Sequence, residues 1–473
     1  MPNRLRPLTA PGSVYRRRRT ELAAALKKPL VIPAGKPRSR NYPANTYPFR
    51  AASTYLYFGG PSLEGAAWLI EPGSNGVDGT TLYRPVFGLD DAVWMGELPD
   101  DDELASAAGV NPTSLGDLDK LRSEIAGRGA VCIPVPCPET IKWMASLAVA
   151  PAGPDELRPI ITMRLAKDRF EIDALRVAAL AAVRAHRAAM AVTRPGHSET
   201  EVLAAYAAVL IETGCEPSFT THASIQGDVL HDSGFRGTMH DGRMLLVDAG
   251  AEEPGGYASD ITRTFPVTGS FTAIQRELYN TVLRAQQAAI ESCFPGRRFR
   301  DIHDLTARVL CEGLVDAGLL RGNPDDLAGR YAHTLFFTHG LGHLVGLDVH
   351  DMEDYGEDLV AYPPGRTRRT EFGNKYLRLD RDLAPDMVVT IEPGLYLVPA
   401  IWRNADMTSR FADVVNRPRI QELLDASFGG IRIEDTVRIR DATYPGPEVL
   451  TGALPKDAET VEQLVGTAQC CRA

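Results

Sequence analysis

The chain has 473 residues, a formal net charge of -10 and 44 % hydrophobic residues, so two or three domains with sizeable cores are expected. The negative charge argues against nucleic acid as a general partner, because a phosphate backbone requires a basic face. No apolar run is long enough to span a bilayer and the N-terminus lacks a signal-peptide core, so no membrane partner is expected. Cys132 and Cys137 are predicted to be buried thiols, which fits a reducing, cytoplasmic environment.

The first 160 residues contain short strand-like runs that glycine and proline interrupt. These runs are "STYLYFGG" (53–60), "GAAWLIEP" (65–72), "TTLYRPVF" (80–87) and "GAVCIPVPCP" (129–138). Helical stretches are predicted near Thr20 and Asp117, and "YRRRRT" (15–20) is interpreted as the solvated start of the first of them. The sequence therefore predicts a small mixed α/β domain over residues 1–160.

A different pattern follows the segment 150–159, "APAGPDELRP", which is interpreted as a turn or linker. Residues 167–190 form a long alanine-rich segment with acidic residues in its first turn, which predicts a helix ended by Pro195 and Gly196. The next helix is predicted to begin with a capping box of Ser198 and Glu201. These features place a second domain at residues 161–473.

All ten histidines lie between His186 and His350, so histidine-dependent chemistry belongs to the second domain. Three of them occur in "HGLGHLVGLDVHD" (339–351), where apolar neighbours would hold the polar side chains rigidly, as a metal or catalytic site requires. Structural histidines are the alternative. The remaining histidines at positions 186, 197, 222, 240, 303 and 333 are interpreted as ordinary polar or capping residues, or carry no signal.

Four carboxylates come at the ends of apolar strand-like runs, where an unpaired carboxylate would be costly to desolvate. Asp248 and Asp260 lie in runs that could form a hairpin, and Glu392 and Glu434 occupy matching places in a faint internal repeat. One interpretation is that nearby arginines (263, 432 and 438) neutralise them. The other is a site for two divalent ions such as Mn, Co or Zn, which could deprotonate a shared water.

Together the motifs "DAG...YASDITRTFP", "HGLGHLVGLDVHD", "TIEPGLY" and "GGIRIEDTV" resemble those of the pita-bread (creatinase-like) metallopeptidases of the prolidase and aminopeptidase P group. The resemblance implies an α/β (α+β) fold with a creatinase-like N-terminal domain and a pita-bread catalytic domain. It also implies two divalent metal ions, with manganese favoured, and five ligands. These ligands would be Asp248, Asp260, His343, Glu392 and Glu434.

The same resemblance implies roles within the site. Asp260 and Glu434 would bridge the metals, and Glu392 would also act as the general base for a bridging hydroxide. His231 and His350 would steady the substrate and the oxyanion, and His339 would line the cleft. Arg432 would hold Glu434 or the substrate in place.

Members of the group cleave Xaa-Pro bonds, either in dipeptides (prolidase) or at the N-terminus of longer peptides (aminopeptidase P). Long insertions at 352–385 and 398–427 favour the prolidase interpretation, in which Arg378 would read the substrate's C-terminal carboxylate. Trp94 resembles an aromatic residue that reaches the partner subunit's cleft in prolidase dimers, with buried packing as the alternative. Phe219 stands where the family has a tyrosine, and "TTHASIQGD" (220–228) looks shortened, which could shift specificity.

The expected protein is thus a cytoplasmic homodimer that acts on proline-containing dipeptides or short peptides. Some pita-bread domains have lost their metal ligands and serve as peptide-binding modules, and others bind creatine-like substrates without metal. All five ligand positions carry competent side chains here, which disfavours that alternative. Methionine aminopeptidases generally lack the large first domain, which disfavours them as well.

Overall fold

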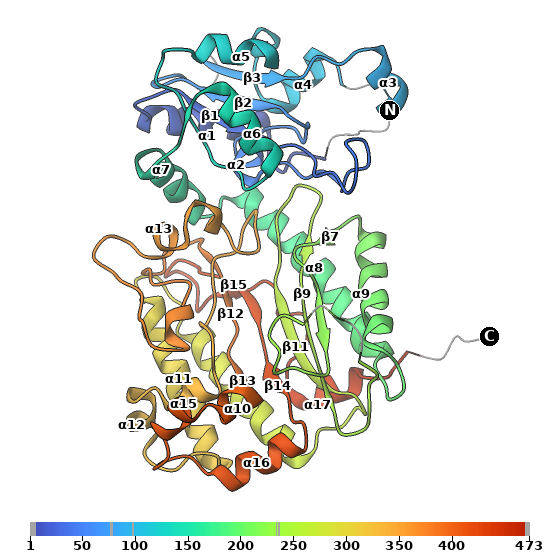
Figure 1. Ribbon diagram of the computed structural model, residues 1–473, viewed down its shortest axis with the longest axis vertical. Helices are drawn as coiled ribbons and strands as arrows, with labels where there is room; N and C mark the ends of the chain where they lie inside the picture. The colour runs from blue at the N-terminus through green and yellow to red at the C-terminus, as the bar shows by residue number, and fades with distance from the viewer. Residues whose placement is uncertain (1–5, 76–78, 97–98, 233, 235–236, 469–473) are drawn as a thin grey trace, which may run out of the picture. The chain divides into compact units, whose positions relative to one another are not determined.

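A computed structural model of the chain describes all residues except 1–5, 76–78, 97–98, 233, 235–236 and 469–473. It divides into two compact units (Figure 1). The first contains Met1–Leu165 together with the short segments Pro254–Gly256 and Met352–Val360. The second contains Ala166–Glu253, Tyr257–Asp351 and Ala361–Ala473. No helix in the described part of the chain is long and apolar enough to cross a membrane.

The first unit is built on a mixed six-stranded sheet with the strand order β4-β3-β2-β1-β5-β6. Its strands are β1 (Leu30–Pro33), β2 (Ala67–Ile70), β3 (Thr80–Arg84), β4 (Leu115–Asp117), β5 (Val131–Cys132) and β6 (Ala150–Pro151). Three consecutive strands pair antiparallel, β1 with β2 and β2 with β3, and the outer pairings are parallel. The predicted strands at 65–72, 80–87 and 129–138 are therefore present.

Helices surround this sheet, and two of them correct the sequence interpretation. They are α1 (Gly12–Ala25), α2 (Ser53–Tyr57), α3 (Leu89–Met95), α4 (Asp101–Ala108), α5 (Leu118–Ile125), α6 (Pro138–Leu147), α7 (Pro154–Leu165) and the short η1 (Pro112–Ser114) and η3 (Glu353–Tyr355). Residues 53–57 form α2 rather than part of a strand, because the periodicity of a short, fully buried run does not distinguish a helix from a strand. The expected linker at 150–159 contains β6 and the start of α7, whose first residue is a proline that suits that position.

Only part of the arginine run of α1 is solvated as expected, since Arg16 and Arg17 are exposed and the next two arginines are not. Arg18 and Arg19 are buried, and each donates hydrogen bonds to backbone carbonyls, for example from Arg19 Nη1 to Phe58 O at 2.7 Å. The Arg19 guanidinium also lies 4.6 Å from the ring centroid of Trp68, and burial lowers its pKa to about 9, with a smaller contribution from Arg16. Cys132 is buried as predicted, but Cys137 is only half-buried because it begins α6 as its N-cap residue.

The second unit contains two similar halves, each with a pair of packed helices followed by an antiparallel strand pair. The first half has α8 (Arg169–Val192), α9 (Glu199–Thr213), β7 (Glu216–Pro217), β8 (His222–Ser224), β9 (Met244–Ala249), β10 (Ala251–Glu252) and β11 (Ile261–Pro266). The second half has α10 (Ala273–Glu291), α11 (Phe299–Asp316), β12 (Val388–Ile391), β13 (Gly394–Tyr396), β14 (Gly430–Arg432), β15 (Asp435–Arg438) and β16 (Glu448–Val449). In Figure 1 the strand pairs run through the middle of this unit, with α9 on one flank and α11 on the other.

Shorter helices complete the second half. They are α12 (Pro324–Gly329), η2 (Ala332–Leu335), η4 (Asn374–Tyr376), α14 (Pro399–Arg403), α15 (Ala405–Ser409), α16 (Arg417–Asp425) and α17 (Ala458–Leu464). The short α13 (Glu357–Ala361) belongs to the first unit except for its last residue. One apolar core runs through both halves and includes Met190 of α8, Leu245 of β9, Leu310 of α11 and Ile431 of β14. This shared core fixes the two strand pairs against each other.

The predicted helix starts hold in this unit. Ser198 N donates to Glu201 Oε2 at 2.8 Å and Glu201 N donates to Ser198 Oγ at 3.3 Å, which is the capping box expected from the sequence. The α8 helix begins with a second such box, formed by Asp168 and Glu171. Local capping therefore positions the two helices that support the first half of the site.

Candidate metal and active site

The four predicted carboxylates meet at the ends of the two strand pairs. Asp248 lies near the end of β9 and Asp260 immediately precedes β11, whose first residue pairs with Ala249. In the second half Glu392 immediately follows β12, and Glu434 immediately precedes β15. Antiparallel pairing thus brings both acids of each half to the same end of their strand pair, as the internal repeat predicted.

All five expected metal ligands line one cavity of about 880 Å³ in the second unit. The lining residues are Phe219, Thr220, His222, Leu230, His231, Asp248, Asp260, Thr338, His339, Gly340, Gly342, His343, Val349, His350, Phe372, Tyr376, Arg378, Glu392, Arg432 and Glu434. Every residue predicted for this site is among them except Trp94. The cavity is large enough for a short peptide.

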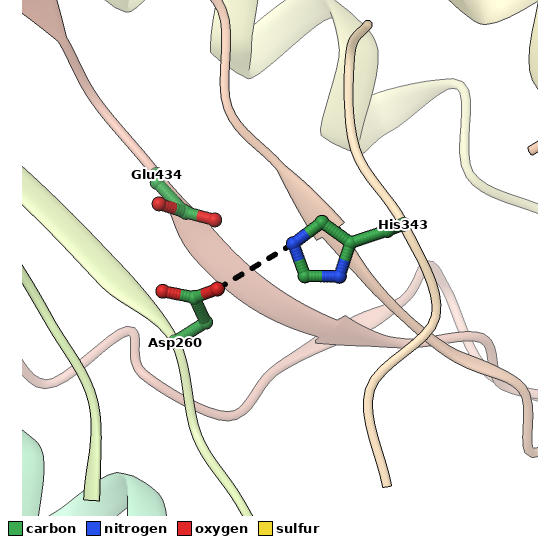
Figure 2. A group of neighbouring side chains, drawn as sticks. All are labelled: Asp260, His343 and Glu434. Atoms are coloured by element: carbon green, nitrogen blue, oxygen red, sulfur yellow. Dashed lines mark ion pairs between the residues drawn. The ribbon is translucent and has the colours of Figure 1, made fainter. Parts of the chain in front are cut away.

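The tightest part of the cluster contains Asp260, His343 and Glu434, each of which offers a ligand atom within 4.8 Å of the others. Figure 2 shows the three side chains pointing toward one another from separate segments. His343 Nε2 lies 3.5 Å from Asp260 Oδ2 and 3.7 Å from Glu392 Oε1, too far for good hydrogen bonds. His343 Nδ1 lies 3.1 Å from the Leu344 carbonyl, so Nδ1 carries the proton and the Nε2 lone pair faces the carboxylates.

This donor set fits divalent cations. Asp260 Oδ1 is buried and has no hydrogen-bond partner within the described residues, which leaves a carboxylate oxygen available to a metal. Oxygen ligands with one imidazole suit hard or borderline divalent ions. The arrangement gives Asp260, His343 and Glu434 as the centre of the site, with Glu392 at its edge.

Like charges dominate the electrostatics of the cluster. Burial raises the pKa of Glu434 well above its ordinary value, and Asp260 and Glu392 raise it further. Burial also raises the pKa of Asp260, to which Asp248 adds, and that of Glu392, although His343 and Arg432 partly oppose it there. Such a cluster ionises fully only when cations join it.

Arg432 compensates part of this charge, but its partner differs from the expected one. Its Nη2 donates to Asp248 Oδ2 at 2.6 Å, and its Nε donates to Thr262 Oγ1 at 2.9 Å. Thr262 Oγ1 in turn donates to Glu434 Oε2 at 2.6 Å, so Arg432 reaches Glu434 only indirectly. The alternative of arginine neutralisation therefore applies directly to Asp248, while Arg263 and Arg438 pair with Asp435 and Asp386 instead.

Tyr396, which the sequence analysis did not single out, connects Arg432 to His339. Its hydroxyl accepts from Arg432 Nη1 at 3.0 Å and lies 2.8 Å from His339 Nε2. His339 Nδ1 lies 2.8 Å from the Gly340 carbonyl, so its Nε2 is the acceptor of the Tyr396 hydroxyl. Burial and then Arg432 lower the pKa of His339 to about 3, which keeps it neutral. The signal for Tyr396 was its place at the end of the "TIEPGLY" motif.

The other two cleft histidines face the cluster from different loops. The ring of His350 stacks on that of His343, with centroids 4.0 Å apart. His231 follows β8, and burial together with His222 lowers its pKa. His222, interpreted from the sequence as an ordinary polar residue, lines the same cavity and stacks on His231, with ring centroids 5.3 Å apart. In contrast, the buried pair His303 and His333 lies outside the cavity lining.

The remaining expected residues divide between the two units. Arg378 and Phe219 line the cavity. Trp94 belongs to α3 of the first unit, and its side chain is 86 % exposed, so the alternative of buried packing is wrong. A partner subunit's contact with Trp94 stays a prediction.

Comparisons with known proteins identify the class of this site. Residues 173–441, more than half of the chain, match metallopeptidase family M24, and residues 15–130 match the aminopeptidase P N-terminal domain. The chain therefore belongs to metallopeptidase family M24, and the resemblance and the two-part α/β fold expected from the motifs are confirmed. The family implies divalent metal ions in the cavity.

Individual relatives match along almost the whole chain. The Xaa-Pro aminopeptidase of Escherichia coli K12 is 31 % identical over 89 % of this chain and 90 % of its own length. The human Xaa-Pro dipeptidase is 30 % identical over 96 % of this chain and 94 % of its own length. The solved structure of the aminopeptidase PepP from Pseudomonas aeruginosa has a TM-score of 0.78 and 28 % identity, covering 97 % and 98 % of the two chains.

Proposed function

We propose that the protein is a metal-dependent hydrolase of Xaa-Pro bonds. The convergence of Asp248, Asp260, His343, Glu392 and Glu434 in one peptide-sized cavity carries this proposal. The similarity to an Xaa-Pro aminopeptidase and an Xaa-Pro dipeptidase supplies the substrate class. A non-catalytic binding module would not need five competent ligands and a free lone pair on His343.

Two divalent ions fit the cluster, and manganese is proposed as the native metal, with cobalt or zinc as alternatives. Asp248, Asp260, His343, Glu392 and Glu434 would hold the ions. When bound, the ions supply a water of lowered pKa as nucleophile and polarise the carbonyl that it attacks.

Side chains of the protein then orient the substrate and transfer the proton. Glu392 takes the proton from the attacking water and returns it to the proline nitrogen, which lies on the leaving side. His231 and His350 donate to the oxygen that becomes negative, and neutral His339 lines the cleft beside Glu392, with its Nδ1 3.6 Å from Glu392 Oε2. Arg432 holds Asp248 in place through the 2.6 Å contact.

The dipeptidase activity of prolidase is the proposed specificity, because Arg378 lines the cavity where a guanidinium can pair with the free carboxylate of a dipeptide. Aminopeptidase P activity is the second candidate, and it is favoured by the similarity to the E. coli and P. aeruginosa enzymes over nearly their full length. In aminopeptidase P activity the product side stays open to longer peptides.

Hydrolysis of Ala-Pro and of Ala-Pro-Ala by the manganese-loaded protein, followed by mass spectrometry, distinguishes the two activities. For a dipeptidase, Ala-Pro is cleaved, Ala-Pro-Ala is not, and Arg378→Gln raises KM for Ala-Pro about tenfold or more. Arg366→Gln is the matched control, since Arg366 pairs with Asp382 outside the cavity lining. Efficient cleavage of Ala-Pro-Ala with no effect of Arg378→Gln would assign aminopeptidase P activity instead.

We further propose a cytoplasmic homodimer in which residues 1–160 form a domain that serves dimerisation and residues 161–473 form the catalytic domain. The free thiols of Cys132, Cys215, Cys293 and Cys311, all buried, suit a reducing compartment. Exposed Trp94 on α3 is the proposed contact with the partner subunit. Light scattering of the wild-type protein and of Trp94→Ala tests the dimer, which the substitution should weaken.

A further inference from the structure

Phe219, His222 and His231 form one wall of the cavity. Of these three residues, only His231 has a role in the chemistry proposed above. The ring centroids of His222 and His231 are 5.3 Å apart with planes only 17° from parallel, and Phe219 lies 6.3 Å from His222. All three line the cavity. They form a ladder of flat rings, against which a planar side chain can stack.

The strand pairing places His222 beside a metal ligand. In the register of β8 and β9, His222 is directly opposite Asp248, and on the other side of β9 Asp248 is opposite Thr262. Directly opposed residues of antiparallel strands project their side chains from the same face, about 5 Å apart. His222 is therefore the neighbour of Asp248 on the side away from the Thr262–Glu434 contact.

The hydrogen bonding of His222 defines what this neighbour can recognise. His222 Nδ1 lies 3.2 Å from the Asp232 carbonyl, which can only accept, so Nδ1 carries a proton and donates it. Nε2 has no protein partner among the described residues, and it is absent from their buried unpaired atoms. Nε2 is therefore the ring atom left to form a hydrogen bond with whatever occupies the cavity.

We propose that His222 determines specificity for the residue before proline, and that it selects a planar side chain carrying a hydrogen-bond donor, as in tyrosine. This inference rests on the proposed function, in which the carbonyl of that residue lies over the metal ligands and the proline lies toward Arg378. The side chain of the same residue then lies along the wall next to Asp248. It stacks on the ring ladder and donates to His222 Nε2.

The test compares two substrates that differ by one hydroxyl, Tyr-Pro and Phe-Pro, or their Xaa-Pro-Ala forms if the wild-type protein cleaves only those. The metal-loaded wild-type protein is expected to prefer the tyrosine substrate by about tenfold in kcat/KM. His222→Phe keeps a flat ring and removes the polar Nε2, so the ratio of the two kcat/KM values should fall to about one. His222→Gln retains an acceptor and should keep part of the preference.

His240→Phe is the matched control, because His240 is an exposed histidine outside the cavity lining, and its ratio should equal that of the wild-type protein. Three results would overturn the inference: no tyrosine preference in the wild-type protein, the same preference in His222→Phe, or an equal loss on both substrates. The last of these would make His222 a positioning residue for Asp248. If the metal-loaded wild-type protein cleaves no Xaa-Pro peptide at all, the proposed function itself falls.

Discussion

Glu434 and Asp435 are adjacent, both buried, and opposite in their electrostatics. Glu434 faces the cavity with Asp260 and Glu392 nearby, and burial together with these acids raises its pKa well above the ordinary value. Burial alone would raise the pKa of Asp435 too, but Arg263 and Lys456 lower it well below the usual range. Neighbouring side chains of an extended chain point to opposite faces, which separates the two environments.

The partners of each acid explain the difference. Asp435 accepts from Arg263 Nη2 at 2.9 Å, Lys456 Nζ at 2.7 Å, Thr451 Oγ1 at 2.7 Å and Gln286 Nε2 at 2.9 Å. The carboxylates of the cavity have far fewer donors and repel one another. Burial of an acid therefore does not by itself indicate a functional site. A buried acid that lacks hydrogen-bond donors and faces other acids does indicate one.

The largest expected effect comes from a substitution on the cavity side of this comparison. Glu392→Gln removes the proposed general base and one anionic ligand without changing the size of the side chain. Xaa-Pro hydrolysis should fall by about 10³-fold. The melting temperature of the metal-free protein should not fall, because the amide relieves repulsion from Asp260 and Asp248. A large loss of stability in that metal-free protein would show that Glu392 is a structural acid.

Asp435→Asn tests the other side of the comparison. It leaves the buried guanidinium of Arg263 without its carboxylate, and breaking one partner of a buried ion pair costs about 3 kcal/mol. We expect the free energy of unfolding in urea to fall by that amount, while the kcat of the molecules that remain folded changes far less than in Glu392→Gln. Equal losses of kcat in the two variants would remove the distinction between the acids.

The depressed pKa of Asp435 also predicts a pH dependence. Because the folded-state pKa lies below the unfolded value of about 3.9, the ionised pair stabilises the protein above that pH and the contribution is lost as the pH falls through the folded-state pKa. Between pH 6 and pH 3 the metal-free wild-type protein should lose roughly 1 kcal/mol more stability than metal-free Asp435→Asn. Urea unfolding at several pH values measures the difference, and parallel curves would contradict it.

The comparison also shows how far the sequence alone leads. The strands β9 and β12, the capping box of Ser198 and the meeting of the five proposed ligands in one cavity were predictable, because each depends on a local pattern or on a motif of adjacent residues. Acids at the ends of buried strands correctly indicated which carboxylates line the cavity. Which arginine serves which acid was not predictable, since Arg432 pairs with Asp248 and Arg263 with Asp435, residues far apart in the chain.

The errors have the same physical origin. Arg18 and Arg19 were expected to be solvated because charged residues usually are. In the structure, backbone carbonyls far away in the sequence accept their hydrogen bonds, and Arg19 also packs against the Trp68 ring. His222 was interpreted as an ordinary polar residue although it lies in the shortened segment 220–228, and its register with Asp248 brings it to the cavity lining. The surroundings of these residues depend on contacts with residues far away in the sequence, and a local sequence pattern does not predict such contacts.

The smallest expected effect comes from Asp386→Asn, which removes an acid of a partly exposed ion pair. Asp386 pairs with Arg438 at 2.7 Å, but the two side chains are 39 % and 24 % exposed, and Arg438 also pairs with Glu448. Asp386 has a positive φ of 64°, which asparagine tolerates, so Asp386→Asn changes the charge without straining the backbone. The loss in free energy of unfolding should stay below about 1 kcal/mol, because solvent screens the pair. The opposite result is that Asp386→Asn lowers the free energy of unfolding as much as Asp435→Asn does. In that case the strength of these ion pairs would depend on their position at the ends of β12 and β15, and not on burial or on the number of hydrogen-bond donors around the acid.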